Sequence, residues 1–251
     1  MEHYHEHYLP SDLVITAAGA VDHDLLVAAA VAALSAGGWA MDAIAPPRAR
    51  RDTAAAAIAP TEPIRVVRRS LEQVNLIIGA PSLSVSDKRR PSLSVMSAIL
   101  GGGMSSRLFQ EVRERRGLVY SVYAYAPGYS DAGLFSMAAG CSPKKLPEVV
   151  RVMTAELERI ASEPVTELEL QRAVGQMSGS GALALEDSDT RMSRLGRAEL
   201  SLGEFVDLDE ATSRLAAVTA DDVLAIAAEI VSAQRCVAAV GPIDEDALVA
   251  S

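Results

Sequence analysis

The chain has 251 residues, enough for one large domain or for one domain and part of another. Hydrophobic residues make up 49% of it and charged residues 22%, so the composition excludes a disordered chain and predicts a well-buried core. The net charge of −10 argues against nucleic acid and against an anionic membrane surface as partners, and it fits an extended peptide better.

The chain shows no targeting or membrane segment and is therefore predicted to be cytoplasmic. No secretory apolar region follows Met1, because the first ten residues carry three histidines and two glutamates. The longest apolar stretch, residues 25–41, is short for a membrane span and lacks flanking basic anchors, so we expect a core helix there. Cys141 and Cys236 lie in apolar runs and are expected to be buried free thiols in a reducing compartment.

Two segments near opposite ends of the chain resemble each other. Residues 13–28 read LVITAAGAVDHDLLVA and residues 235–250 read RCVAAVGPIDEDALVA, with Gly19 matching Gly241. Each segment predicts an apolar strand that ends at the glycine, followed by a helix with an aspartate cap and an acidic first turn. The spacing between the two copies is that of a whole domain, which indicates an internal duplication.

This duplication suggests a division of the chain into three parts. Residues 1–44 would be the helix–strand–helix end of a first domain copy. Residues 45–63 have proline at both ends, basic residues and an alanine run, which is typical of a linker. Residues 64–251 would be a complete second copy, so the chain is predicted to be the back half of a longer two-lobed protein.

The second copy is predicted to have an α+β fold, with an antiparallel-dominated mixed sheet covered by a layer of helices. Strands come first, then a block of helices, then a returning strand, and this order differs from alternating βαβ units. The expected strands span residues 64–80, 118–126, 134–141 and 236–240, and the expected helices span residues 91–100, 105–116, 147–162, 166–185, 190–202 and 218–230.

One short segment near the start of the chain matches the sequence pattern of a zinc-binding motif. His3, Glu6 and His7 match H-x-x-E-H, in which two histidines on one helix face bind zinc and the glutamate acts as general base. We judge the match coincidental, because Pro10 ends the helix almost at once and no facing helix offers an acidic third ligand. The chain is therefore expected to lack a metal site and a catalytic residue.

A second candidate site is the pair Arg113 and Tyr120, seven positions apart across a predicted helix–strand junction. A planar guanidinium and a phenol close to one another can hydrogen-bond peptide carbonyls. From the spacing alone, an exposed arginine and a tyrosine at the edge of the core are the simpler interpretation.

The surrounding stretch, GGGMSSRLFQEVRERRGLVYSV, favours a functional role for Arg113 and Tyr120 over this simpler interpretation. It resembles the C-terminal-half signature of the pitrilysin/insulinase family of zinc metallopeptidases, best in the branch of bacterial and mitochondrial processing peptidases. The resemblance implies that a catalytic zinc lobe is followed by a homologous lobe without metal, and that the two close over an unfolded peptide. It further implies that Arg113 and Tyr120 hold the substrate near the zinc of the other lobe.

The chain is therefore expected to be the substrate-binding, non-catalytic half of a zinc endopeptidase, inactive by itself. Its expected partners are an extended peptide and a catalytic zinc-bearing lobe or subunit, and homodimerisation is predicted for the isolated chain. No cofactor is expected in this chain, because zinc would belong to the missing lobe. Two alternatives stay open: a structural or assembly subunit of the same family, and a self-sufficient zinc peptidase that uses His3, Glu6 and His7.

Overall fold

The computed structural model describes residues 2–9, 12–39, 59–202 and 204–249. Contacts divide the chain into two compact units: Met1–Thr53 with Gly181–Val206, and Ala54–Ser180 with Asp207–Ser251. These boundaries are set by contacts and differ from the division by duplication, since the first unit also takes residues from the predicted second copy. Most of the predicted linker, residues 45–58, lies outside the described residues.

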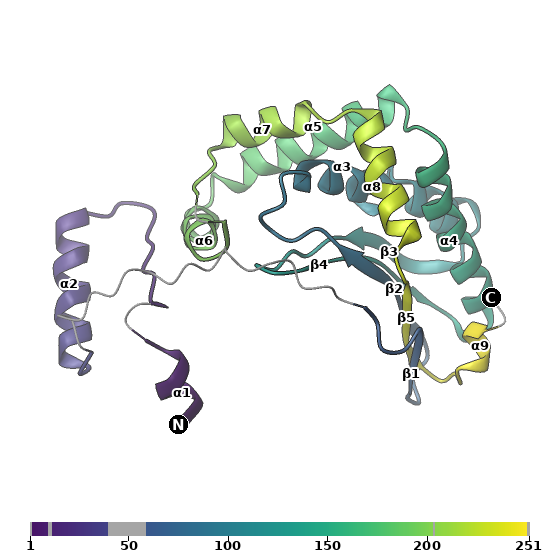
Figure 1. The fold of residues 1–251 in the computed structure, drawn as a ribbon, viewed down its shortest axis with the longest axis horizontal. Coiled ribbons are helices and arrows are strands. Elements are labelled where there is room, and N and C mark those ends of the chain that lie inside the picture. The colour runs from purple at the N-terminus through teal and green to yellow at the C-terminus, as the bar shows by residue number, and fades with distance from the viewer. Residues whose placement is uncertain (1, 10–11, 40–58, 203, 250–251) are drawn as a thin grey trace. The chain divides into compact units, whose positions relative to one another are not determined.

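A five-stranded mixed sheet forms the base of the larger unit, in the order β1-β5-β2-β4-β3 (Figure 1). The strands are β1 (Ile64–Arg68), β2 (Val74–Ser82), β3 (Val119–Tyr125), β4 (Gly133–Cys141) and β5 (Cys236–Gly241). Only β1 and β5 run parallel, and the other neighbouring pairs are antiparallel. The predicted α+β class with an antiparallel-dominated sheet is confirmed.

The single long strand predicted over residues 64–80 is wrong, because the chain forms two strands there. Residues 69–73 are polar apart from Leu71 and break the strand, and β5 lies between β1 and β2 in the sheet. The backbone N–H of Arg69 donates to the carbonyl of Gly241, and that of Leu71 donates to Arg69, so the chain turns away from the strand direction. A strand from the far end of the chain therefore separates two segments that are neighbours in sequence.

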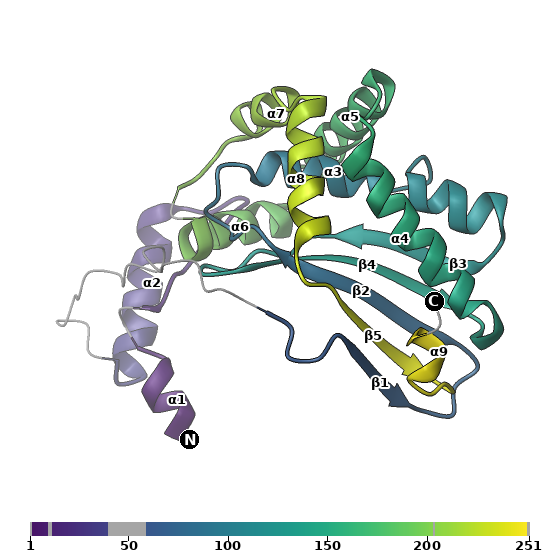
Figure 2. The ribbon, with the colours of Figure 1, turned by 45° about the vertical axis from the view of Figure 1, so that its right-hand side comes forward.

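Helices cover one face of this sheet, with α3, α4 and α8 packed nearest to it (Figure 2). The helices of this unit are α3 (Arg90–Gly101), η2 (Phe109–Arg115), η3 (Pro143–Lys145), α4 (Leu146–Ser162), α5 (Glu167–Ala184, which belongs to this unit as far as Ser180), α7 (Leu208–Ala216), α8 (Ala220–Ser232) and α9 (Asp246–Val249). Local signals set several of these starts: Thr219 and Asp222, for example, form a capping box at α8.

The hydrophobic core lies between the helices and one face of the sheet. Strand alternation places Leu76 of β2 beside Ala139 of β4 and Ala239 of β5, and all three are buried. On the opposite face Ile77 is 40% exposed and Tyr123 is 50% exposed. The sheet of this unit therefore has one covered face and one open face.

Close packing between α3 and β3 depends on a glycine. A Cβ atom at Gly101 would lie 2.3 Å from the backbone nitrogen of Ala124. The glycine run after residue 100 thus lets the end of α3 contact the backbone of β3 directly. A second glycine, Gly117, has φ of +58°, and it ends η2 at the predicted position.

The smaller unit contains α1 (Glu2–His7), α2 (His23–Ala36), α6 (Ser188–Arg197) and the π-helical turn η4 (Ala198–Leu202). Asp22 caps α2 as predicted, with its carboxylate accepting from the Leu25 N–H at 3.0 Å. The strand predicted over residues 13–18 is absent, because no neighbouring strand pairs with this segment in the described residues. The helix α2 is not a core helix either, since none of its residues is buried.

Two further expectations concern membranes and thiols. Within the described residues, no helix combines the length and apolar character that crossing a bilayer requires. Both cysteines are free, but only Cys141 is buried, and Cys236 is half-buried at the start of β5. Burial raises the pKa of the Cys141 thiol to about 11, so this side chain is unreactive at neutral pH.

Candidate functional site

The helix that carries Arg113 is wound as a π-helix over Phe109–Arg115, which the sequence did not predict. Single π-helical turns occur often at functional sites. Arg113 is exposed, and its guanidinium carbon lies 4.7 Å from the centroid of the Phe109 ring. The cation is therefore held over an aromatic face and does not extend freely into solvent.

The neighbouring arginines differ from Arg113 because each has a carboxylate partner. Arg115 and Arg116 both bind Glu111, whose side chain is 13% exposed. The hydrogen bond from Arg116 and the charges of both arginines lower the pKa of Glu111. Within the described part of the chain, Arg113 has no ion-pair partner, so its hydrogen-bond donors stay available for a ligand.

Arg107 is charged but only 9% exposed. Its Nε and Nη2 atoms donate to the two carboxylate oxygens of Glu169 at 2.7 and 3.2 Å. Burial opposes ionisation of Glu169, yet the hydrogen bonds from Arg107 and Thr166 lower its pKa to about 2. This ion pair connects the start of the Arg113 helix to the first turn of α5, and no sequence motif predicted it.

Tyr120 lies in the edge strand β3 and is 68% exposed. Val119 pairs with Cys141 and Ser121 pairs with Gly140, so Tyr120 is the extra residue of a β-bulge. Tyr120 does not share a strand face with Val122, which is buried under the helices. The bulge turns the phenol outward instead, as bulges beside functional sites commonly do.

A short turn fixes the two candidate residues relative to each other. The N–H of Leu118 donates to the carbonyl of Val112 at 2.9 Å, which ties the start of β3 to the end of η2. No hydrogen bond or ring contact joins Arg113 to Tyr120 in the described structure. Both side chains are exposed, within three residues of this tie, and each keeps hydrogen-bonding capacity for a peptide.

The described residues do not form a metal site. No group of three or more histidine, cysteine, aspartate or glutamate side chains among them could hold a metal ion. The residues that match H-x-x-E-H lie on α1, which ends at His7. The side chain of His7 is not among those described. The judgement that His3, Glu6 and His7 match by coincidence stays a prediction.

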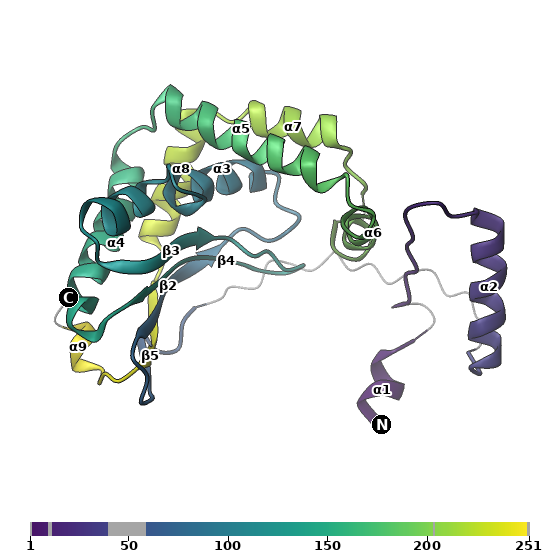
Figure 3. The ribbon, with the colours of Figure 1, turned by 180° about the vertical axis from the view of Figure 1, so that it is seen from behind.

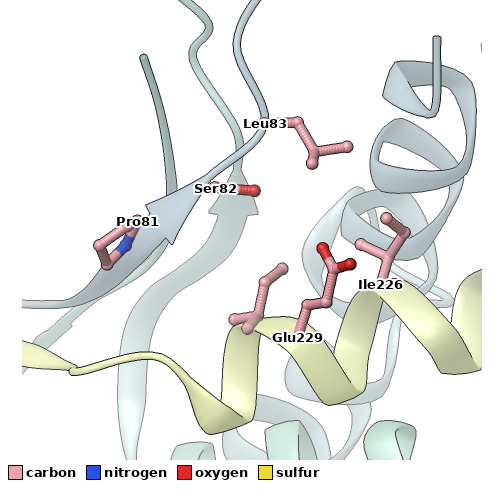
Figure 4. Close-up of a pocket in the computed structure, with 6 residues that line it drawn as sticks. Pro81, Ser82, Leu83, Ile226 and Glu229 are labelled. Carbon is pink, nitrogen blue, oxygen red and sulfur yellow. The ribbon is translucent and has the colours of Figure 1, made fainter. Parts of the chain in front are cut away.

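Two cavities in the larger unit are candidates for ligand binding. The smaller has a volume of about 220 Å³ and lies between the end of β2 and α8, lined by Ser82, Leu83 and Ile226 among others. Figure 4 shows the Glu229 side chain pointing from α8 toward Leu83. Its carboxylate accepts a hydrogen bond from Arg89 at 2.6 Å, so this charge is already matched.

The larger of the two, about 330 Å³, lies between α3, the end of β3 and α5. Ser94, Ser97 and Ala98 line it with the i, i+3, i+4 spacing that an H-x-x-E-H helix uses for its zinc site. None of these three residues can bind zinc or act as a general base. This side of the cavity therefore has the residue spacing of a zinc-binding helix, but these three positions carry neither zinc ligands nor a general base.

A family model described as "Peptidase M16 inactive domain" matches residues 1–177. The chain belongs to this family, the inactive-domain part of the zinc proteases.

Relatives in several bacteria support this assignment. An uncharacterized zinc protease of Streptomyces coelicolor is 42% identical over 245 residues, which cover 96% of this chain and 52% of that protein. One from Mycobacterium tuberculosis is 38% identical over 235 residues, covering 94% of this chain and 53% of the relative. The chain thus spans about half the length of the curated relatives it matches.

Solved structures show the same fold at low sequence identity. The peptidase M16 inactive domain from Pseudomonas fluorescens superposes with a TM-score of 0.71 at 21% identity, over 86% of this chain and 51% of that chain. A protease from Helicobacter pylori gives 0.70 at 18% identity, over 90% and 54%. A chain of complex III2 from Candida albicans gives 0.72 at 20% identity, over 90% and 55%.

Proposed function

We propose that this chain is the substrate-binding, non-catalytic half of a zinc endopeptidase and that it holds extended peptides against a zinc-bearing lobe absent from the chain. Arg113 and Tyr120 are the proposed contacts. The guanidinium would donate to peptide carbonyls, and the phenol would donate to a second carbonyl on the same extended segment. The chain by itself would neither bind zinc nor cleave peptides.

One observation carries this proposal: among the residues that the structure describes, Arg113 has no carboxylate partner, while the arginines around it are paired. Arg115 and Arg116 share Glu111, and Arg107 is held by Glu169. Water solvates the exposed guanidinium of Arg113, so the side chain needs no carboxylate, and its donors can exchange water for peptide carbonyls. A peptide carbonyl accepts these hydrogen bonds without introducing a buried charge.

The N-terminal residues support a missing first lobe. We propose that residues 1–44 are the end of that lobe and residues 64–251 the complete second lobe. Leu25 on α2 is 71% exposed and Ile15 is 52% exposed, so within the described residues neither apolar side chain is covered. Such a surface is expected to bind the catalytic lobe, or a second copy of this chain when that lobe is absent. The two free thiols suit a reducing compartment such as the cytoplasm.

Peptide binding can be measured by fluorescence anisotropy with a labelled, unstructured peptide and the complete chain. We expect Arg113→Ala to weaken binding by about ten-fold and Tyr120→Phe by about five-fold, in line with the loss of charged and neutral hydrogen bonds. Arg151→Ala, on an exposed site of α4, and Tyr129→Phe, on an exposed loop tyrosine, are the matched controls and should leave affinity unchanged.

The same preparation distinguishes the alternatives. Stoichiometric zinc with chelator-sensitive cleavage would promote His3, Glu6 and His7 to a catalytic site and overturn the proposal. Absence of peptide binding, with stable association to a folded protein partner, would favour a structural or assembly subunit. Binding that depends on Arg113 and Tyr120, without zinc and without cleavage, is the result we expect.

A further inference from the structure

A buried carboxylate on α4 lies beside the helix that carries Arg113. Glu156 is 6% exposed, and its Oε1 atom accepts a hydrogen bond from Nη1 of Arg159 at 3.1 Å. Its Oε2 atom is buried and has no hydrogen-bond partner among the described residues. Buried carboxylates are usually hydrogen-bonded through both oxygens, because water no longer solvates their charge. Glu156 therefore keeps a charge at a position where an uncharged side chain of the same size would lose less hydration.

An arginine at the start of the neighbouring helix has a matching unpaired group. Arg107 donates from Nε and Nη2 to Glu169 of α5, while its Nη1 atom is buried without a hydrogen-bond partner within the described part of the chain. A guanidinium carries five N–H donors arranged as a fork, so one arginine can serve two carboxylates. The helices α4 and α5 lie on the same side of the sheet (Figure 3), and α4 packs against η2. Arg107 can therefore be held from α4 as well as from α5.

Four charged side chains act on the Glu156 carboxyl. Burial raises the pKa of this group above its ordinary range, and the negative charge of Glu111 on η2 adds to the rise. The positive charges of Arg159, Arg107 and Arg116 oppose it. Arg107 is thus close enough to Glu156 for its charge to favour the ionised carboxylate, although no hydrogen bond joins the two side chains.

The neighbouring carboxyls stay ionised to lower pH. The hydrogen bond from Arg116 lowers the pKa of Glu111. The pKa of Glu169 falls to about 2, because its hydrogen bonds, chiefly those from Arg107, outweigh the effect of its burial. Glu156 is therefore the first of these three carboxyls to take up a proton as the pH falls.

We propose that Glu156 is a positioning residue for the Arg113 helix: as an anion it attracts Arg107 from α4 while Glu169 holds it from α5, and the start of η2 is fixed between the two. Protonation of Glu156 removes the attraction from one side and loosens η2. The consequence for peptides rests on the proposed function, because Arg113 lies on η2 and presents its donors only while this helix keeps its winding. The grip on a peptide should therefore weaken as the pH falls.

This role differs from that of a residue that only stabilises the fold. A carboxyl whose pKa is raised by folding contributes stability below its unfolded pKa, and the contribution is lost as the pH rises through the folded pKa. Ionised Glu156 therefore costs stability, and Glu156→Gln should be at least as stable as wild type in urea titrations above that pKa. Weaker peptide binding by a variant of undiminished stability would distinguish positioning from packing.

Hydrogen exchange of the complete chain, followed by mass spectrometry, tests the link between Glu156 and η2 without any peptide. At about pH 8, the amides of residues 108–117 should exchange about five-fold faster in Glu156→Gln than in wild type, because η2 opens more easily. Glu148→Gln is the matched control, since this exposed glutamate lies on the same helix and pairs with Arg151 at 3.8 Å. It should leave the exchange of η2 unchanged.

Fluorescence anisotropy then tests the consequence for binding. The probe is a rhodamine-labelled, unstructured peptide with capped ends and no titratable side chain, so that only the protein changes charge. Wild-type affinity should fall about five-fold between about pH 8 and about pH 5, and Glu156→Gln should bind at the weaker level throughout. In an Arg113→Ala background Glu156→Gln should have no further effect, because Glu156 acts through the position of Arg113.

The outcomes separate this inference from the general proposal. Exchange of η2 at the wild-type rate in Glu156→Gln would show that the positioning role is wrong, whether or not peptides bind. Stability and affinity lost together would mean that Glu156 only packs, which also overturns the inference, as would faster exchange with unchanged, Arg113-dependent affinity. If wild-type protein binds no peptide, the general proposal fails, and the exchange rates alone decide whether Glu156 holds η2. Faster exchange, undiminished stability and weaker, pH-independent binding by Glu156→Gln support both.

Discussion

The guanidinium of Arg113 lies over the ring of Phe109, with the guanidinium carbon 4.7 Å from the ring centroid. The two residues are four positions apart on η2, and the π-helical winding of this segment places them on one side of the helix. The contact restricts a long side chain that would otherwise sample many rotamers, so less conformational entropy is lost when a ligand binds. Phe109 is therefore a positioning residue for the proposed peptide contact.

Replacing Phe109 tests this relationship directly. We expect Phe109→Leu to weaken peptide binding about three-fold, in line with an exposed cation–π contact, while Phe109→Trp retains wild-type affinity. In an Arg113→Ala background Phe109→Leu should have no further effect, because the ring acts through the cation. An equal loss in both backgrounds, measured by anisotropy, would show that the ring contributes only packing.

The contact between α3 and β3 predicts a strong effect on stability. A methyl group at Gly101 would approach the nitrogen of Ala124 to 2.3 Å and its Cβ atom to 2.7 Å, so helix and strand must separate. We expect Gly101→Ala to lower the free energy of unfolding by about 2–3 kcal/mol in urea titrations. Gly175→Ala, a helix position with open space around it, should raise stability by about 0.5–1 kcal/mol. Equal effects at the two sites would contradict the close-contact interpretation.

The ion pair between Arg107 and Glu169 predicts a pH-dependent contribution to stability. The pKa of Glu169 falls from 4.5 to about 2 on folding, so the unfolded chain holds its proton at higher pH than the folded chain does. The stabilisation is therefore fully present above about pH 4.5 and is lost as the pH falls toward 2. After solvent screening is allowed for, we expect about 1–2 kcal/mol from this group at neutral pH.

Glu169→Gln measures this contribution. The variant should be less stable than wild type at pH 7, and the difference should narrow in titrations at pH 3, where the unfolded wild-type chain already carries the proton. Glu167→Gln, at an exposed position of the same helix turn, is the control and should show no such convergence. A difference that stays constant from pH 7 to pH 3 would mean that Glu169 acts through packing and not through its charge.

Local sequence signals located most of the helices and strands of the larger unit. Thr219 and Asp222 mark the start of α8 because a capping box satisfies backbone groups within four residues. Gly117 ends η2 because its positive φ suits glycine, and the strand that follows lies within one residue of its predicted bounds. The spacing of Arg113 and Tyr120 and the resemblance around them also came from the sequence.

The tertiary structure decided how these elements are combined. Residues 64–80 have the composition of one strand, but β5 from the far end of the chain separates them into two, and no local pattern encodes that insertion. Tyr120 points outward because of a bulge in its pairing with β4, and Arg107 is buried because α5 brings Glu169 to it. Propensity and capping act over a few residues, whereas pairing, burial and charge neutralisation depend on partners distant in sequence. The sequence by itself therefore determined the elements and the candidate pair, and only the folded chain determined that Arg107, Arg115 and Arg116 are paired with carboxylates while Arg113, among the described residues, is not.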